Sequence, residues 1–185
     1  MRARLAERGI ENYIVVAPGG SWRAKCWPAE RFGWVADALI TELGATCVLL
    51  GRDDDREAGH RLEASIRTDA GVRLINLIGQ TDLLMLMGLL WHCRALVAND
   101  SGAVHLAAAI GTPVTTIFGP TSERFSLPLS SSEARGDRVH AVFHPVFCRP
   151  CWLSDCPIDH RCMKKIPPER VFESVRQLLQ AEVRE

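Results

Sequence analysis

The stretch Asn99-Asp100-Ser101-Gly102-Ala103-Val104-His105 follows the apolar run Ala95–Ala98 and leads into a second apolar run. This order of residues predicts a buried strand that turns at once into a helix, with Asn99 or Asp100 as the N-cap. Gly102 lets a ligand approach the backbone closely. Because free amide groups and the helix dipole converge at such a corner, we expect it to bind an anionic group.

The composition excludes several classes of partner and location. The 185 residues carry 22 basic and 22 acidic side chains, so no overall field favours nucleic acid. The longest apolar run, Leu83–Trp91, is shorter than the roughly 20 residues that cross a bilayer. The segment Met1–Arg8 lacks the apolar core of a signal peptide. We therefore expect a cytoplasmic protein without a transmembrane segment.

Apolar runs and helical repeats alternate along the chain. Further strands are expected at Tyr13–Ala17, Thr46–Leu50, Val72–Leu77, Pro113–Phe118 and Val139–Phe143. Helices are expected from Pro28 to a stop at Gly44, after a cap at Thr81 or Asp82, and over Pro168–Ala181. The polar run Arg52–Glu57 is expected to cap a further helix that reaches about Arg67.

This alternation predicts an α/β fold with a doubly wound, mostly parallel sheet of about six strands. A single Rossmann-like domain over residues 1–185 accounts for the length. The helix that begins near Leu83 is apolar nearly all round, which predicts deep burial. Residues Ser122–Asp137 are expected to form a loop.

Ligands of doubly wound sheets bind beyond the carboxyl ends of the strands. The loop after the first strand supplies Ser21, Arg23 and Lys25, which suit a diphosphate opposite the helix that starts at Ser101. The alternatives for these groups stay open. Arg23 and Lys25 also fit a solvated loop, and His105 also fits a histidine at the edge of the core. The acids Asp54, Asp55 and Glu57 fit either a ribose contact or a helix first turn.

Seven pieces of the sequence, in order and with matching spacing, resemble the C-terminal half of the ADP-heptose:lipopolysaccharide heptosyltransferases, glycosyltransferase family 9. They are Pro18–Gly20, Lys25–Pro28, Leu49–Gly51, Asn76–Leu83, Asn99–Ala109, Gly111–Pro113 and Phe118–Thr121. The Asn-Asp-Ser-Gly form and the cysteine pattern near the C-terminus are similar to heptosyltransferase II.

The resemblance implies the donor-binding half of a GT-B enzyme that needs no metal or other cofactor and transfers heptose with inversion. It implies that Lys25, Ser101 and Gly102 stabilise the ADP leaving group. The donor ADP-heptose would be bound by Ser21, Lys25, Asp54, Glu57, Thr81, Asp100, Ser101, Gly102 and His105.

In this family the proposed catalytic base belongs to an N-terminal, acceptor-binding domain, which the resemblance does not find in this chain. The lipopolysaccharide core acceptor would bind through that domain, and the chain alone is expected to be inactive. Peripheral association with the inner membrane is compatible with such a reaction.

A Cys-rich segment at residues 144–165 suggests a different class of function. Cys148, Cys151, Cys156 and Cys162 are candidate zinc ligands, with His144 and His160 nearby. Their spacing is not that of a zinc ribbon, and buried thiols or disulfides fit equally. The alternative function is therefore a non-catalytic nucleotide- or zinc-binding interaction module.

Overall fold

The structure, a computed structural model, describes residues 12–68, 73–128 and 138–182. The expectations drawn from Met1–Arg8 and from most of the loop between Ser122 and Asp137 lie outside these ranges. Within the described ranges, no helix combines the length and the apolar character needed to cross a membrane.

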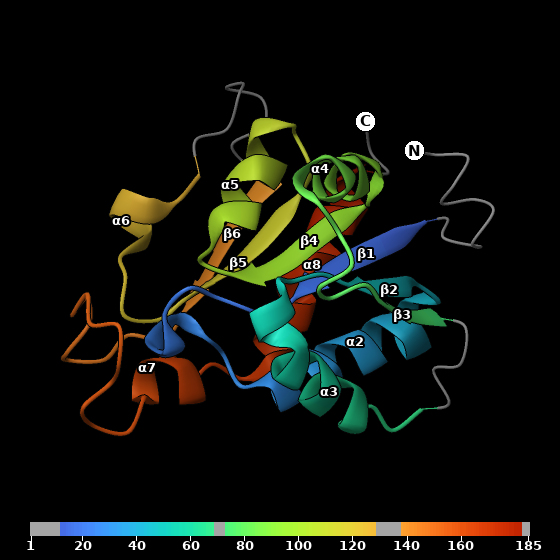
Figure 1. Ribbon diagram of the computed structural model, residues 1–185. Helices are drawn as coiled ribbons and strands as arrows, with labels where there is room; N and C mark the ends of the chain where they lie inside the picture. The colour runs from blue at the N-terminus through green and yellow to red at the C-terminus, as the bar shows by residue number, and fades with distance from the viewer. Residues whose placement is uncertain (1–11, 69–72, 129–137, 183–185) are drawn as a thin grey trace.

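Within the described residues, six parallel strands form one sheet in the order β3-β2-β1-β4-β5-β6 (Figure 1). The strands are β1 (Tyr13–Ala17), β2 (Thr46–Leu49), β3 (Leu74–Asn76), β4 (Ala95–Asn99), β5 (Val114–Phe118) and β6 (Val139–Phe143). The predicted fold class is thus confirmed, and the strand ends differ from expectation by two residues at most. The strand order reverses between β1 and β4. The loop that follows β1 and the loop that follows β4 therefore diverge and leave a crevice between them.

Helices cover both faces of this sheet (Figure 1). The helices of the described residues are α2 (Ala29–Leu43), α3 (Arg56–Ala64), α4 (Leu83–His92), α5 (Gly102–Ala109), α6 (Glu123–Ser126), α7 (Arg161–Lys164) and α8 (Pro168–Glu182), of which α6 and α7 are single turns. Two short 3-10 turns, η1 (Arg23–Lys25) and η2 (Asp53–Asp55), lie after β1 and β2.

Strand β1 contributes to two separate apolar cores. Ile14 and Val16 pack with α2 and α8, whereas Tyr13, Val15 and Ala17 pack with α4 and α5. All five side chains are buried, which explains why β1 is a continuous apolar run rather than an alternating one.

Helix α4 differs from its predicted environment. Leu89 and Leu90 are fully buried, but Leu84 is 77% exposed and Trp91 is 64% exposed. The prediction of deep burial all round is therefore wrong, because one face of α4 packs on the sheet and α5 while the opposite face is open. Its N-cap is Asp82, whose carboxylate accepts a hydrogen bond from the Met85 amide at 2.7 Å.

Two other local predictions need correction. Helix α3 ends at Ala64 rather than near Arg67. The segment expected to be a loop contains the single turn α6, capped by Ser122, whose hydroxyl accepts a hydrogen bond from the Arg124 amide.

Candidate functional site

Asn99, at the end of β4, is hydrogen-bonded to the loop on the other side of the crevice. The side-chain amide of Asn99 donates to the carbonyl oxygens of Pro18 at 2.8 Å and Gly19 at 3.1 Å, and its oxygen accepts from the Trp27 amide at 3.0 Å. Asn99 is fully buried. It therefore fixes both ends of the β1–α2 loop to the central strand.

Asp100 is buried next to Asn99 and forms an ion pair across the crevice. Its Oδ2 lies 2.8 Å from Lys25 Nζ and accepts a hydrogen bond from the Thr121 hydroxyl at 2.7 Å. Lys25 Nζ also lies 4.8 Å from the centroid of the Trp22 ring. Neither Asn99 nor Asp100 caps α5, so that prediction is wrong. The N-cap is Ser101, which makes no side-chain capping bond.

A cavity of about 470 Å³ lies at the start of α5. It brings together four of the predicted site residues from three loops and the N-terminus of α5, namely Ser21, Thr81, Ser101 and Gly102. A Cβ built on Gly102 would meet nothing within 4 Å, so the backbone here is open. Because Ser101 leaves the first turn of α5 uncapped, the helix N-terminus is available to an anion.

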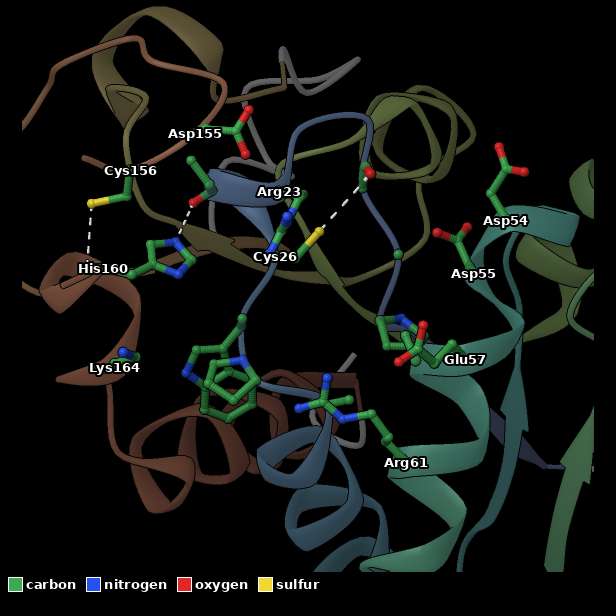
Figure 2. Close-up of a pocket in the computed structure, with 18 of the residues that line it drawn as sticks. Arg23, Cys26, Asp54, Asp55, Glu57, Arg61, Asp155, Cys156, His160 and Lys164 are labelled. Carbon is green, nitrogen blue, oxygen red and sulfur yellow. Dashed lines mark hydrogen bonds between the residues drawn. The ribbon is translucent and has the colours of Figure 1, made fainter. Parts of the chain in front are cut away.

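A second cavity of about 970 Å³ lies on the other side of the β1–α2 loop (Figure 2). Asp54 and Glu57 line this larger cavity and not the smaller one, while Asp55 lines both. The Asp55 carboxylate accepts a hydrogen bond from the Arg52 amide at 2.8 Å. A Cβ built on Gly19 would lie only 2.2 Å from the Cγ atom of Asp55. The glycine is therefore required for the close approach of the two loops.

His105 is exposed on α5 and lines neither cavity. Its predicted contact with the donor stays a prediction. Sequence reasoning missed the apolar wall of the smaller cavity, formed by Leu50, Leu83, Leu86 and Leu106. Apolar helix positions carry no signal that distinguishes a cavity wall from a core.

Burial favours the protonated form of two thiols, Cys26 and Cys162. Burial raises the pKa of Cys26, the Asp55 carboxylate adds to the rise, and Arg23 opposes it. Burial and then the neighbouring Cys156 raise the pKa of Cys162. In the described part of the chain, no group of three or more histidine, cysteine, aspartate or glutamate side chains is arranged to hold a metal ion. The zinc hypothesis for the Cys-rich segment thus has no geometric support.

Comparison with known proteins identifies relatives of this arrangement. The family model for glycosyltransferase family 9 (heptosyltransferase) matches residues 2–150. Lipopolysaccharide heptosyltransferase 2 of Escherichia coli K12 is 36% identical over 168 residues, covering 90% of this chain and 46% of the relative. Lipooligosaccharide heptosyltransferase 2 of Haemophilus ducreyi is 38% identical over 136 residues, covering 70% of this chain and 39% of the relative.

Solved structures agree with the fold. The E. coli ADP-heptose heptosyltransferase II superposes with a TM-score of 0.82 at 29% identity, covering 98% of this chain and 51% of that structure. The E. coli heptosyltransferase WaaC with ADP has a TM-score of 0.68 at 18% identity, a likeness that shows the fold alone. The chain spans about half the length of these curated relatives. On the match over residues 2–150, the chain belongs to glycosyltransferase family 9, the heptosyltransferase family.

Proposed function

We propose that this chain is the donor-binding half of a glycosyltransferase that moves heptose from ADP-heptose to the inner core of lipopolysaccharide. Family membership supports the reaction class. The observation that carries the donor-binding role is the smaller cavity, where Ser21, Thr81, Ser101 and Gly102 meet beside the uncapped start of α5.

In this proposal the diphosphate lies at the α5 N-terminus. The open backbone at Gly102 and the helix dipole favour its negative charge. Lys25, whose ammonium is already anchored by Asp100, supplies the positive charge that stabilises ADP as it leaves. The leucines of the cavity wall offer an apolar surface to the adenine, and Thr81, which lines the same cavity, would lie near the adenosine.

The proposed reaction is an inverting displacement without a metal. The oxygen of an acceptor hydroxyl bonds to the anomeric carbon of heptose, the bond from that carbon to the ADP oxygen breaks, and the hydroxyl proton passes to a carboxylate base. We assign that base to no residue of this chain. We propose instead that an acceptor-binding unit supplies it, and that the isolated chain binds the donor but transfers negligibly. The proposal places the reaction in the cytoplasm, at or near the inner membrane.

Binding to ADP and ADP-heptose tests the proposal. Calorimetric titration of the purified chain is expected to give binding for both ligands, with GDP and UDP as weaker controls. A transfer assay with a lipopolysaccharide core acceptor is expected to give no product. Absence of ADP binding would contradict the donor-binding role, and measurable transfer would contradict the need for a second unit. A non-catalytic interaction module would instead show no selectivity among nucleotides.

A further inference from the structure

The Cys-rich segment, residues 144–165, binds both polar groups of Ala24. The Ala24 amide donates to the Ser154 carbonyl at 2.9 Å. On the other side, His160 Nε2 lies 2.6 Å from the Ala24 carbonyl oxygen (Figure 2). Because a carbonyl oxygen can only accept, Nε2 carries the hydrogen of this bond. One segment therefore binds both backbone polar groups of this residue.

Ala24 is the middle residue of η1, and Lys25 follows it directly. The turn has no side-chain cap. Its internal backbone bonds, Lys25 amide to Trp22 carbonyl and Cys26 amide to Arg23 carbonyl, measure 3.0 and 3.1 Å. A single turn of 3-10 helix is weak by itself. Asn99 fixes the two ends of the β1–α2 loop, and the bonds that the Cys-rich segment makes to Ala24 hold the turn in its middle.

The same segment also holds the counter-ion of Lys25. The guanidinium of Arg149 donates to the carbonyl oxygens of Gly119 at 2.8 Å and Thr121 at 2.9 Å. The hydroxyl of Thr121 in turn donates to Asp100. Residues 149–160 thus act on both partners of the Lys25–Asp100 ion pair. They bind the backbone next to Lys25, and they fix Thr121, whose hydroxyl donates to Asp100.

His160 is itself held in one orientation. Its backbone lies in the left-handed region with φ 58°, and its amide donates to Cys156 Sγ at 3.2 Å. The ring faces the β1–α2 loop across the edge of the larger cavity, where Figure 2 draws it between Cys156 and η1.

We propose that His160 is a positioning residue of the donor site, which through its hydrogen bond to Ala24 places Lys25 against the diphosphate. This inference rests on the proposed function, since it assumes that Lys25 contacts the diphosphate of ADP. His160 does not touch the nucleotide. In this proposal the Cys-rich segment holds η1, the turn that carries Lys25, in place.

The test compares two substitutions of similar length, His160→Met and His160→Gln. Only the glutamine amide restores an N–H donor toward the Ala24 carbonyl. ADP affinity is expected to fall about fivefold to tenfold in the Met variant, the size of one lost hydrogen bond, and to recover in the Gln variant. Adenosine, which has no phosphate, is expected to bind all three proteins equally. His144→Ala, which removes another imidazole of the same segment, is the matched control.

A double-mutant cycle separates positioning from general loosening. In a Lys25→Met background, His160→Met is expected to change ADP affinity less than twofold, because the group that it places is gone. Equal ADP affinity of His160→Met and wild type, equal weakness of the Met and Gln variants, or additive effects in the cycle would each overturn the proposal. Failure of the wild-type chain to bind ADP would instead overturn the proposed function. If His160→Met unfolds, His160→Asn, whose amide is too short to reach Ala24, takes its place.

Discussion

Two adjacent residues at the end of β4 have different tasks. Asn99 fixes the β1–α2 loop through three hydrogen bonds, whereas Asp100 faces the crevice and pairs with Lys25. Both residue types are common helix caps, so the sequence around them predicts a capping role. The real cap, Ser101, frees both side chains for contacts that lie more than 20 residues away in sequence.

Substitutions in the Lys25–Asp100 ion pair test its effects on ADP affinity and on protein stability separately. Lys25→Met is expected to lower ADP affinity at least about tenfold, since a charge-assisted contact is lost. It also leaves Asp100, 4% exposed, without its counter-ion, which is expected to cost about 1 to 3 kcal/mol of unfolding free energy, because Lys25 is partly exposed.

Adding Asp100→Asn to that variant is expected to restore the stability and not the affinity. The amide oxygen still accepts from Thr121, and no charge remains buried. Urea unfolding and calorimetric titration measure the two effects. Recovery of ADP binding in the double variant would contradict the assigned role of Lys25.

Two helical glycines are expected to respond to alanine with opposite signs. Gly102 has open space where a Cβ would stand, so Gly102→Ala is expected to leave stability unchanged or raise it by up to about 1 kcal/mol. The added methyl enters the smaller cavity and is expected to weaken ADP binding.

Gly33 in α2 provides the contrast. A Cβ there would lie 1.8 Å from Ser65 Oγ and 2.5 Å from the Leu62 carbonyl oxygen. Gly33→Ala is therefore expected to cost about 1 to 3 kcal/mol with little direct effect on the cavity. Thermal unfolding with and without ADP measures both variants, and a destabilised Gly102→Ala protein would contradict the open geometry.

At the scale of elements, α4 shows where periodicity fails as a guide. Its ten residues are almost all apolar, so the pattern contains no polar face that marks the solvent side. Leu89→Ala is expected to cost about 2 to 5 kcal/mol because Leu89 is fully buried. Leu84→Ala is expected to stay within about 0.5 kcal/mol of wild type. Urea unfolding of the two variants checks this difference, and equal losses would mean that Leu84 is covered in solution.

Most elements were predictable because their signals are local. The β-branched run of β1, the αL glycine that ends α2 at Gly44 and the amphipathic α8 each lie within one element. The Cys-rich segment was not, because its contacts join residues about 30 to 136 positions apart. Sequence spacing identified the cysteines and gave no indication that His160 reaches Ala24.

The candidate site was likewise predictable only in part. Ser21, Thr81, Ser101 and Gly102 line one cavity, because parallel strands end at the same edge, and their contact with the donor stays a prediction. The orientation of each loop was not predictable. Asp54 and Glu57 line the larger cavity, and their contact with the donor, which the family resemblance implies, stays a prediction.

At the scale of the whole molecule, stability is expected to fall at both ends of the pH range. Arginine partners help to hold the pKa of Glu123, Asp159 and Glu173 below the usual value. The pKa of Glu30 is lowered first by a backbone hydrogen bond and then by the hydrogen bond from Arg61. At Glu123 burial acts to raise the pKa, but the hydrogen bond from Arg149 and further favourable contacts outweigh it. Lowered folded pKa values give stability that is complete above about pH 4.5 and is lost as the pH falls.

At alkaline pH the relevant pKa values are raised rather than lowered. Burial raises the pKa of Cys47 to about 12, and the pKa values of Cys26 and Cys162 are raised as well. Stability from these thiols is complete below the unfolded pKa of about 8.5 and is lost as the pH rises above it. Urea unfolding between about pH 3 and 10 is expected to give a maximum near pH 5 to 8. Glu123→Gln should flatten the acid limb and Cys47→Ala the alkaline limb, while a maximum outside this range would contradict the assignment.

The hydrogen bond from Asn99 to Pro18 joins residues 81 positions apart, and it has a consequence for biosynthesis. A ribosome completes β1, β2 and β3 before β4 exists, and these three pair among themselves in the finished sheet. Until β4 emerges, that half sheet ends in the unpaired, wholly apolar edge of β1, which is a template for aggregation. The strand that leads into the proposed anion site is thus also the strand that protects the nascent chain from its neighbours on the polysome.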